Sequence, residues 1–160
     1  MKKIFIPTDF TPESLELVEY AVLNHPSTQL NIILLAGFRS PDKRWDLIHL
    51  NPKKEIWGQL NSRFKEFQRR LLLDHKESIV NISFELFTGI NSYAFRNFLE
   101  LHGVEDAVVP AASVLHYRSE KWFDPTSFIK ENVKNVIEVP IERTKEVPKR
   151  KFSITSLFNL

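Results

Sequence analysis

The clearest indication of the fold is the segment Lys3-Ile4-Phe5-Ile6-Pro7-Thr8-Asp9-Phe10-Thr11-Pro12. Its first half is β-branched and aromatic and ends in a proline, which is typical of a short buried strand. Thr11 followed by Pro12 predicts a helix start, because a hydroxyl caps a helix and proline fits its first turn. A buried strand that leads directly into a helix indicates an α/β unit, with Asp9 at the junction.

Four more strands and three more helices follow the same logic. The apolar run at 30–36 suits a central parallel strand that is covered on both faces, whereas the alternation within 79–87 predicts a strand near an edge. Gly103 is expected to end the helix before the fourth strand. The other expected strands are 105–110 and 136–141, and the other expected helices are 51–71, 91–102 and 124–132. This alternation predicts a parallel sheet with helices on both faces.

Three regions between these elements carry weaker signals. Residues 37–50 read as a loop, and residues 111–124 read as irregular. Trp57 lies beside the apolar stripe of the helix expected at 51–71 and is expected in the core. Trp122 and Phe123 precede the last helix and are interpreted as packing residues.

Composition sets limits on the function. The 160 residues suit one domain over 1–141, followed by a basic and apolar tail over 142–160. No cysteine is present, which excludes disulfides and thiolate catalysis and fits a reducing cytoplasm. The net charge is +2, with +3 in residues 141–160 and −1 in the rest, so we expect no nucleic-acid partner. The apolar runs are too short to span a bilayer, so we expect a cytoplasmic protein without a membrane partner.

The opening Ile4-Phe5-Ile6-Pro7-Thr8-Asp9-Phe10-Thr11-Pro12-Glu13-Ser14 resembles that of a universal stress protein. That family begins with an apolar strand, Pro-(Thr/Val)-Asp and a helix start rich in Ser and Thr. Residues 30–36 and 100–109 are similar to its second strand and to the stretch around its fourth strand. The resemblance covers residues 1–140 and implies an adenine-nucleotide alpha-hydrolase-like fold with five parallel strands in the order 3-2-1-4-5.

The glycine-rich phosphate loop of the family is missing. Members that hold ATP carry Gly-x2-Gly-x9-Gly-(Ser/Thr) after the fourth strand, whose backbone N–H groups approach the phosphates. Here Val109-Pro110-Ala111-Ala112-Ser113-Val114-Leu115-His116-Tyr117-Arg118 has no glycine, and no glycine follows Gly103. Pro110 stands at or beside the first motif position and offers no N–H. We therefore expect no ATP binding in the manner of the family and no cofactor, with an adenine nucleotide as the alternative.

The candidate ligand residues lie around the carboxyl ends of the strands, where parallel sheets bind ligands. The resemblance implies that Asp9 would lie by an adenine and ribose, while its other interpretation is a carboxylate that favours the next helix start. Thr126 and Ser127 are candidates for the terminal hydroxyls of the motif, with helix capping as the alternative. If a nucleotide site is retained, the expected residues are Pro7, Thr8, Asp9, Ala36, Ser113, Thr126 and Ser127.

Other groups give no catalytic or metal pattern. The five histidines have no metal-ligand spacing, and His116-Tyr117-Arg118 reads as a solvated loop. We expect no metal and no enzyme activity, although an uncharacterised enzyme that uses Asp9 is a third alternative. Whether Tyr117, Trp122 or Phe123 fills the cleft above Asp9 decides between these alternatives.

The first hypothesis is a non-catalytic module of a stress response or of signalling, which pairs through its last strand as a homodimer. The interface candidates are Val136, Ile137, Val139 and Ile141. The tail is either mobile or an arm that packs Phe152, Ile154, Leu157 and Phe158 on a protein partner. The second hypothesis is a nucleotide-binding protein in which Arg118, Lys121 or Ser127 replaces the glycine loop.

Overall fold

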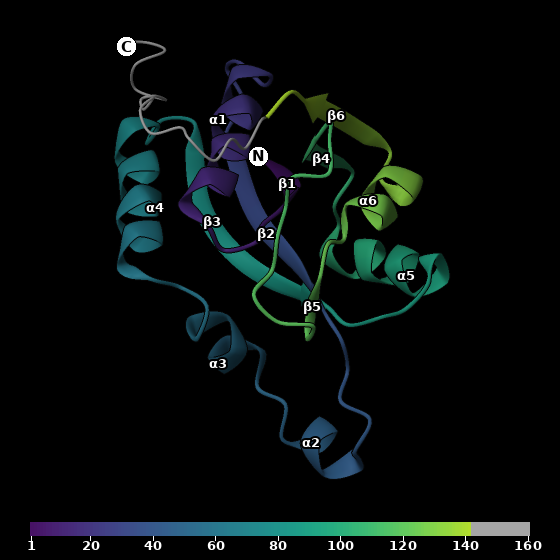
Figure 1. The fold of residues 1–160 in the computed structure, drawn as a ribbon. Helices are drawn as coiled ribbons and strands as arrows, with labels where there is room; N and C mark the ends of the chain where they lie inside the picture. The colour runs from purple at the N-terminus through teal and green to yellow at the C-terminus, as the bar shows by residue number, and fades with distance from the viewer. Residues whose placement is uncertain (142–160) are drawn as a thin grey trace.

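A computed structural model of the chain describes residues 1–141, so the predicted tail lies outside the described residues (Figure 1). The strands are β1 (Lys2–Pro7), β2 (Leu30–Phe38), β3 (Ile79–Phe87), β4 (Asp106–Pro110), β5 (Trp122–Phe123) and β6 (Asn135–Val139). The helices are the 3-10 helix η1 (Pro12–Leu15), α1 (Glu16–Leu23), α2 (Arg44–Ile48), α3 (Pro52–Trp57), α4 (Ser62–Asp74), α5 (Ser92–His102) and α6 (Thr126–Asn132).

Five strands form a parallel sheet in the order β3-β2-β1-β4-β6. The five parallel strands therefore follow the predicted order 3-2-1-4-5. β1 lies in the middle and pairs with β2 over its whole length, from Lys2 opposite Leu30 to Pro7 opposite Leu35. β3 lies at one edge, as its alternating sequence predicts.

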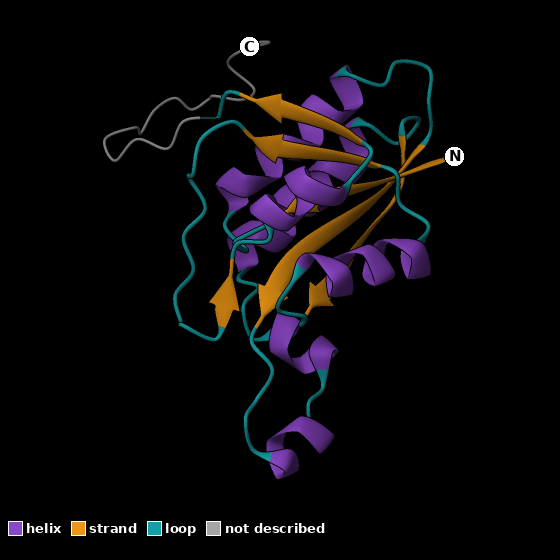
Figure 2. Cartoon of the chain, turned by 90° about the vertical axis from the view of Figure 1, so that its right-hand side faces the viewer, coloured by secondary structure: helices purple, strands orange, loops and turns teal. Residues whose placement is uncertain are grey.

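Helices cover both faces of the sheet, as predicted (Figure 2). On one face, η1, α1 and α4 bury Leu15, Val18 and Phe64 against the sheet. On the other face, α5 and α6 bury Phe95 and Ile129. Burying each of these side chains stabilises the fold by about 1.5–3 kcal/mol. None of the helices within residues 1–141 is long and apolar enough to cross a bilayer.

A third apolar cluster lies at the carboxyl ends of the strands. It joins residues from β2, β3, β5, α3 and the turn after β1. Its buried members are Phe10, Ala36, Phe38, Ile56, Leu86 and Trp122. The edge of the sheet at which α/β proteins bind their ligands is therefore partly occupied by apolar side chains of the chain itself.

The helix ends follow the local signals of the sequence. Thr11 caps η1 by accepting from the N–H of Ser14, and Asn91 caps α5 by accepting from that of Ala94. Gly103 ends α5 with a φ of 66°, a left-handed conformation that glycine adopts at little cost. The predictions for Thr11 and Gly103 are confirmed.

The region between β2 and β3 corrects three predictions. The single helix expected at 51–71 is two helices, because Asn61 starts α4 with a new cap after α3 has ended at Trp57. Trp57 is 62% exposed, so the expectation of a core position is wrong, and its ring packs against the Nζ of Lys65 instead. The loop expected at 37–50 contains the end of β2 and α2, which projects from the body (Figure 1).

The irregular stretch at 111–124 ends in a short strand. Phe38 and Gly37 at the end of β2 pair antiparallel with Trp122 and Phe123, which form β5. Two paired residues leave almost no periodicity to read from a sequence. The interpretation of Trp122 as a packing residue is confirmed, since it is 4% exposed.

Candidate functional site

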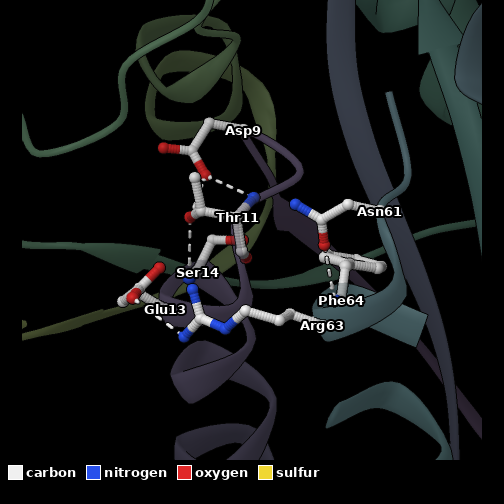
Figure 3. A network of polar contacts seen from close by, with 7 residues as sticks. All are labelled: Asp9, Thr11, Glu13, Ser14, Asn61, Arg63 and Phe64. Carbon is white, nitrogen blue, oxygen red and sulfur yellow. Dashed lines mark hydrogen bonds and ion pairs between the residues drawn. The ribbon is translucent and has the colours of Figure 1, made fainter. Parts of the chain in front are cut away.

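The junction after β1 brings Pro7, Thr8 and Asp9 to the middle of the strand ends, as predicted. Both oxygens of the Asp9 carboxylate accept hydrogen bonds from the chain. Oδ1 accepts from the N–H of Thr11 at 3.1 Å and from its hydroxyl at 2.5 Å (Figure 3), and Oδ2 accepts from the N–H of His116 at 3.0 Å. Asp9 is 6% exposed. The carboxylate therefore acts as the cap of a turn and as an anchor for a distant loop.

Thr8 and Ser14 are buried beneath Asp9 and bond to each other at 3.0 Å between their hydroxyl oxygens. The Ser14 hydroxyl donates to the carbonyl of Thr11, and the N–H of Phe10 donates to the Thr8 hydroxyl. Each hydroxyl has one proton, so Thr8 donates its proton to Ser14. Neither hydroxyl is bonded to a histidine or a carboxylate, the kind of base that activates a nucleophile.

The loop after β4 crosses the ends of β1 and is fixed there at two points. The hydroxyl of Tyr117 donates to the carbonyl of Thr8 at 2.7 Å, next to the bond from His116 to Asp9. His116 and Tyr117 read as solvated in the sequence, and that interpretation is wrong for the Tyr117 ring and for the His116 backbone. Burial, and then the nearby carboxylates of Asp124 and Asp9, raise the pKa of Tyr117 well above its usual range. The phenol therefore remains a neutral donor.

Aromatic rings close the remaining space. Phe10 follows Asp9 in a left-handed conformation, with φ at 65°, which is uncommon for a residue of this size. Its ring meets Trp122 edge-on at 4.9 Å between centroids and stacks on Phe84 at 6.4 Å. The unusual backbone of Phe10 thus directs the ring into the apolar cluster at the strand ends.

The structure brings only part of the predicted site together. Ala36 is buried in the apolar cluster beside Phe10, while Ser113 is exposed on the loop. Thr126 donates through its N–H and its hydroxyl to Asp124 Oδ1, at 2.9 and 2.5 Å, so both groups are used in the turn that precedes α6. Ser127 is exposed in the first turn of α6. None of these four residues bonds directly to Asp9.

Within residues 1–141, no group of three or more His, Asp and Glu side chains is arranged to hold a metal ion. The acidic side chains around the site, Asp9 and Asp124, each face donors from neighbouring threonines. The polar groups around Asp9 fix a loop and cap a helix start. Among these groups no acid and base are paired for proton transfer.

The role of His116 is not predictable from the sequence, because the bond to Asp9 uses its backbone N–H and not its ring. Any residue except proline could supply that donor, so the side chain carries no signal. Tyr117 could have been suspected, since an aromatic ring in an otherwise polar loop often packs inward.

Comparisons with known proteins support the fold. No protein-family model matches the chain. No curated protein matches it either. Among solved structures, the universal stress protein UspA from Lactobacillus plantarum is 17% identical and has a TM-score of 0.52, over 86% of this chain and 97% of that one.

Two more solved structures are similar in outline. A universal stress protein in complex with cAMP is 16% identical, with a TM-score of 0.45, over 88% of this chain and 98% of the other. A universal stress protein family member from Burkholderia pseudomallei is 12% identical, with a TM-score of 0.45, over 87% of this chain and 96% of the other. The Lactobacillus protein and the strand order together show that this chain has the α/β fold of the universal stress proteins.

Proposed function

We propose that this chain is a non-catalytic member of the universal stress protein family, a cytoplasmic module of a stress response or of signalling that works as a homodimer. We further propose that it does not bind ATP in the manner of the family. The observation that carries the proposal is the hydrogen bond from the N–H of His116 to Asp9 at 3.0 Å. This bond holds the loop after β4 over the carboxyl ends of the strands.

A nucleotide at Asp9 would have to open this closure. It would displace the loop from both anchors, the bond from His116 to Asp9 and the bond from Tyr117 to Thr8. Leaving each buried polar group without its partner costs about 1–3 kcal/mol. It would also separate Trp122 from Phe10. Pro110, which offers no N–H, does not supply a phosphate contact in return.

The non-catalytic part of the proposal rests on the hydroxyls and the carboxylate at the same place. Thr8 and Ser14 hydrogen-bond to each other and to the backbone, and Asp9 bonds to donors on Thr11 and His116. An enzyme that used Asp9 would need a nucleophile or base converging on a shared open space. These groups instead converge on one another.

The dimer part rests on the free edge of β6. Asn135 donates to Glu105 and Val139 accepts from Ala111, so odd-numbered residues of β6 face β4. Backbone groups alternate sides along a strand, so the N–H and C=O of Val136 and Glu138 point away from the sheet. A second copy pairing there would cover an edge that is otherwise available for aggregation.

The four predicted interface residues have different surroundings in one subunit. Val139 and Ile141 are 3% and 7% exposed and belong to the core of the subunit itself. Val136 and Ile137 are partly buried. We therefore propose that Val136 and Ile137 provide most of the side-chain contact between subunits, and that the outward backbone groups provide the pairing.

Nucleotide binding is tested by isothermal titration of the full chain with adenosine and with ATP plus magnesium. We expect no adenosine binding up to millimolar concentration, because adenosine can enter only through the closed strand ends. Saturable adenosine binding that Asp9→Asn abolishes would contradict the proposal. An adenine nucleotide that copurifies with the unmodified protein, and that Asp9→Asn loses, would contradict it as well.

The dimer is tested by sedimentation of Val136→Pro beside Val136→Ala. Proline removes the outward N–H of this edge residue, where proline is tolerated in sheets, and the alanine variant controls for the loss of the valine side chain, which packs against the core. We expect a monomer for the proline variant and a dimer for the alanine variant. Equal masses for both variants, or a monomeric unmodified protein at high concentration, would contradict pairing through β6.

A further inference from the structure

A depression of about 580 Å³ lies on the outer side of the loop that closes the strand ends. It is open to solvent. It is formed by Arg39, which directly follows β2, and by the loop that leads into β5. Its lining residues are Arg39, Leu115, His116, Tyr117, Arg118, Ser119, Glu120 and Trp122. Its volume falls within the range of small-molecule sites. Asp9 does not line it, so it is separate from the closed position at the strand ends.

Arg39 is held in place at the wall of the depression. Its backbone N–H donates to the carbonyl of Lys121 and its Nε to that of Glu120, both at 2.8 Å. Its guanidinium lies 5.4 Å from the centre of the Phe123 ring. The two Nη groups make no hydrogen bond to the described residues. Backbone and ring contacts thus orient the guanidinium and leave its two Nη groups available to bind a ligand.

Arg118 supplies a second cation. Its guanidinium has no hydrogen bond or ion pair with residues 1–141, and no carboxylate of that part of the chain lies within 4.0 Å of it or of the Arg39 guanidinium. Two guanidinium groups at one depression, neither of them paired with a carboxylate of residues 1–141, form a site for an external anion.

The loop beneath these cations is already ordered. His116 and Tyr117 are tied to Asp9 and Thr8, and Leu115 and Trp122 are 8% and 4% exposed. Ser119 accepts from the N–H of Lys121 at 3.1 Å, which leaves the proton of its hydroxyl for a ligand. A site that is ordered before binding loses less conformational entropy when a ligand binds.

We propose that this depression binds a small organic phosphate, a phosphate monoester whose dianion is held by Arg39 and Arg118 and by the Ser119 hydroxyl. Glu120 also lines the depression, and its carboxylate repels a bare anion. The same carboxylate accepts hydrogen bonds from hydroxyl groups, so it favours a phosphate that carries a polyol over inorganic phosphate. Lys121 and Ser127, the other cation and hydroxyl suggested for a rebuilt phosphate site, do not line the depression.

The site is tested by isothermal titration of the full chain with ribose 5-phosphate, inorganic phosphate and ribose at low salt. We expect ribose 5-phosphate to bind, inorganic phosphate to bind more weakly and ribose not to bind. Arg118→Ala is expected to weaken ribose 5-phosphate binding about tenfold, as the loss of one charge-assisted hydrogen bond does. The control is Arg44→Ala, which removes an exposed arginine outside the depression and is expected to change nothing.

A second variant tests the role of Glu120. Glu120→Gln removes the repulsion and is expected to strengthen the binding of inorganic phosphate about threefold. Equal binding of inorganic phosphate and ribose 5-phosphate would overturn the assignment of an organic phosphate to this depression. Two further results would overturn the proposal. One is that ribose 5-phosphate does not bind at a 10-fold molar excess over about 1 mM protein. The other is that Arg118→Ala and Arg44→Ala weaken its binding equally. Adenosine has no phosphate, so its titration tests only whether the strand ends are closed. Failure of one proposal can therefore be told from failure of the other.

Discussion

The backbone N–H of His116 donates to Oδ2 of Asp9 at 3.0 Å, across 107 residues of sequence. This bond joins the turn after the first strand to the loop after the fourth. Both segments follow the carboxyl ends of adjacent central strands, β1 and β4. Here the loop lies directly on the carboxylate, so Asp9 anchors the loop after β4 to the turn after β1.

Asp9→Asn is expected to destabilise the protein by about 2 kcal/mol. The amide that replaces one carboxylate oxygen cannot accept both from Thr11 and from His116, so one buried donor loses its acceptor. The free energy of unfolding in urea measures the change. A carboxylate kept for ligand binding gives the opposite result, because removing it commonly stabilises a protein.

The control for Asp9→Asn is Asp42→Asn, at an exposed position before α2 without a hydrogen bond to the described residues. Surface substitutions of this kind usually stay within about 0.5 kcal/mol of the unmodified protein. If both variants have the same stability, Asp9 is not the anchor described here.

Tyr117→Phe isolates the second anchor of the loop. Only the hydroxyl is lost, and with it the 2.7 Å bond to the carbonyl of Thr8, so we expect a loss of about 1 kcal/mol in stability. Tyr93→Phe is the matched control, because Tyr93 is 68% exposed, and it is expected to be neutral. Equal urea midpoints for the two variants would contradict the anchoring role of Tyr117.

The same phenol makes stability depend on alkaline pH. Burial, and then Asp124 and Asp9, raise the pKa of Tyr117 in the folded protein, whereas in the unfolded chain tyrosine ionises near its usual value of about 10. Above that value the unfolded state has lost the proton that the folded state retains, so stability falls as pH rises. This residue contributes a slope of about 1.4 kcal/mol per pH unit. Urea unfolding at pH 9, 10 and 11 should show a shallower slope for Tyr117→Phe.

Gly37→Ala is expected to separate β5 from the end of β2. A Cβ at Gly37 would overlap the ring of Phe123, which packs directly over the glycine. We expect a loss of about 1–3 kcal/mol, as for other overpacked sites. The ring also packs against Arg39, so organic phosphate binding should weaken in parallel.

Gly58→Ala provides the comparison for Gly37→Ala. Its Cβ would meet only the carbonyl oxygens of Glu55 and Lys54 at 3.6 Å, an ordinary contact, and the backbone is helical. We expect this variant to be neutral or slightly stabilising. Equal losses for the two glycines would show that Phe123 does not lie against Gly37.

Local signals in the sequence predict the sheet and its helices. The closing of the strand ends by the loop after β4 depends on contacts between residues far apart in the sequence, which local signals do not predict. Thr11, Asn91 and Gly103 each act within four residues, so their roles can be read from the chain. The bond from His116 uses a backbone group, and its position depends on how the whole loop folds back. The break between α3 and α4 was missed because the apolar stripe continues across it, although Asn61 is a capping residue.

Hydrogen exchange of the His116 amide measures whether Asp9 holds the loop over the strand ends. If its N–H is held by Asp9, exchange in the unmodified protein should be at least about tenfold slower than in Asp9→Asn, and should not change when adenosine is added. Exchange at the rate of an unprotected loop amide, or a change on adding adenosine, would mean that the strand ends are open.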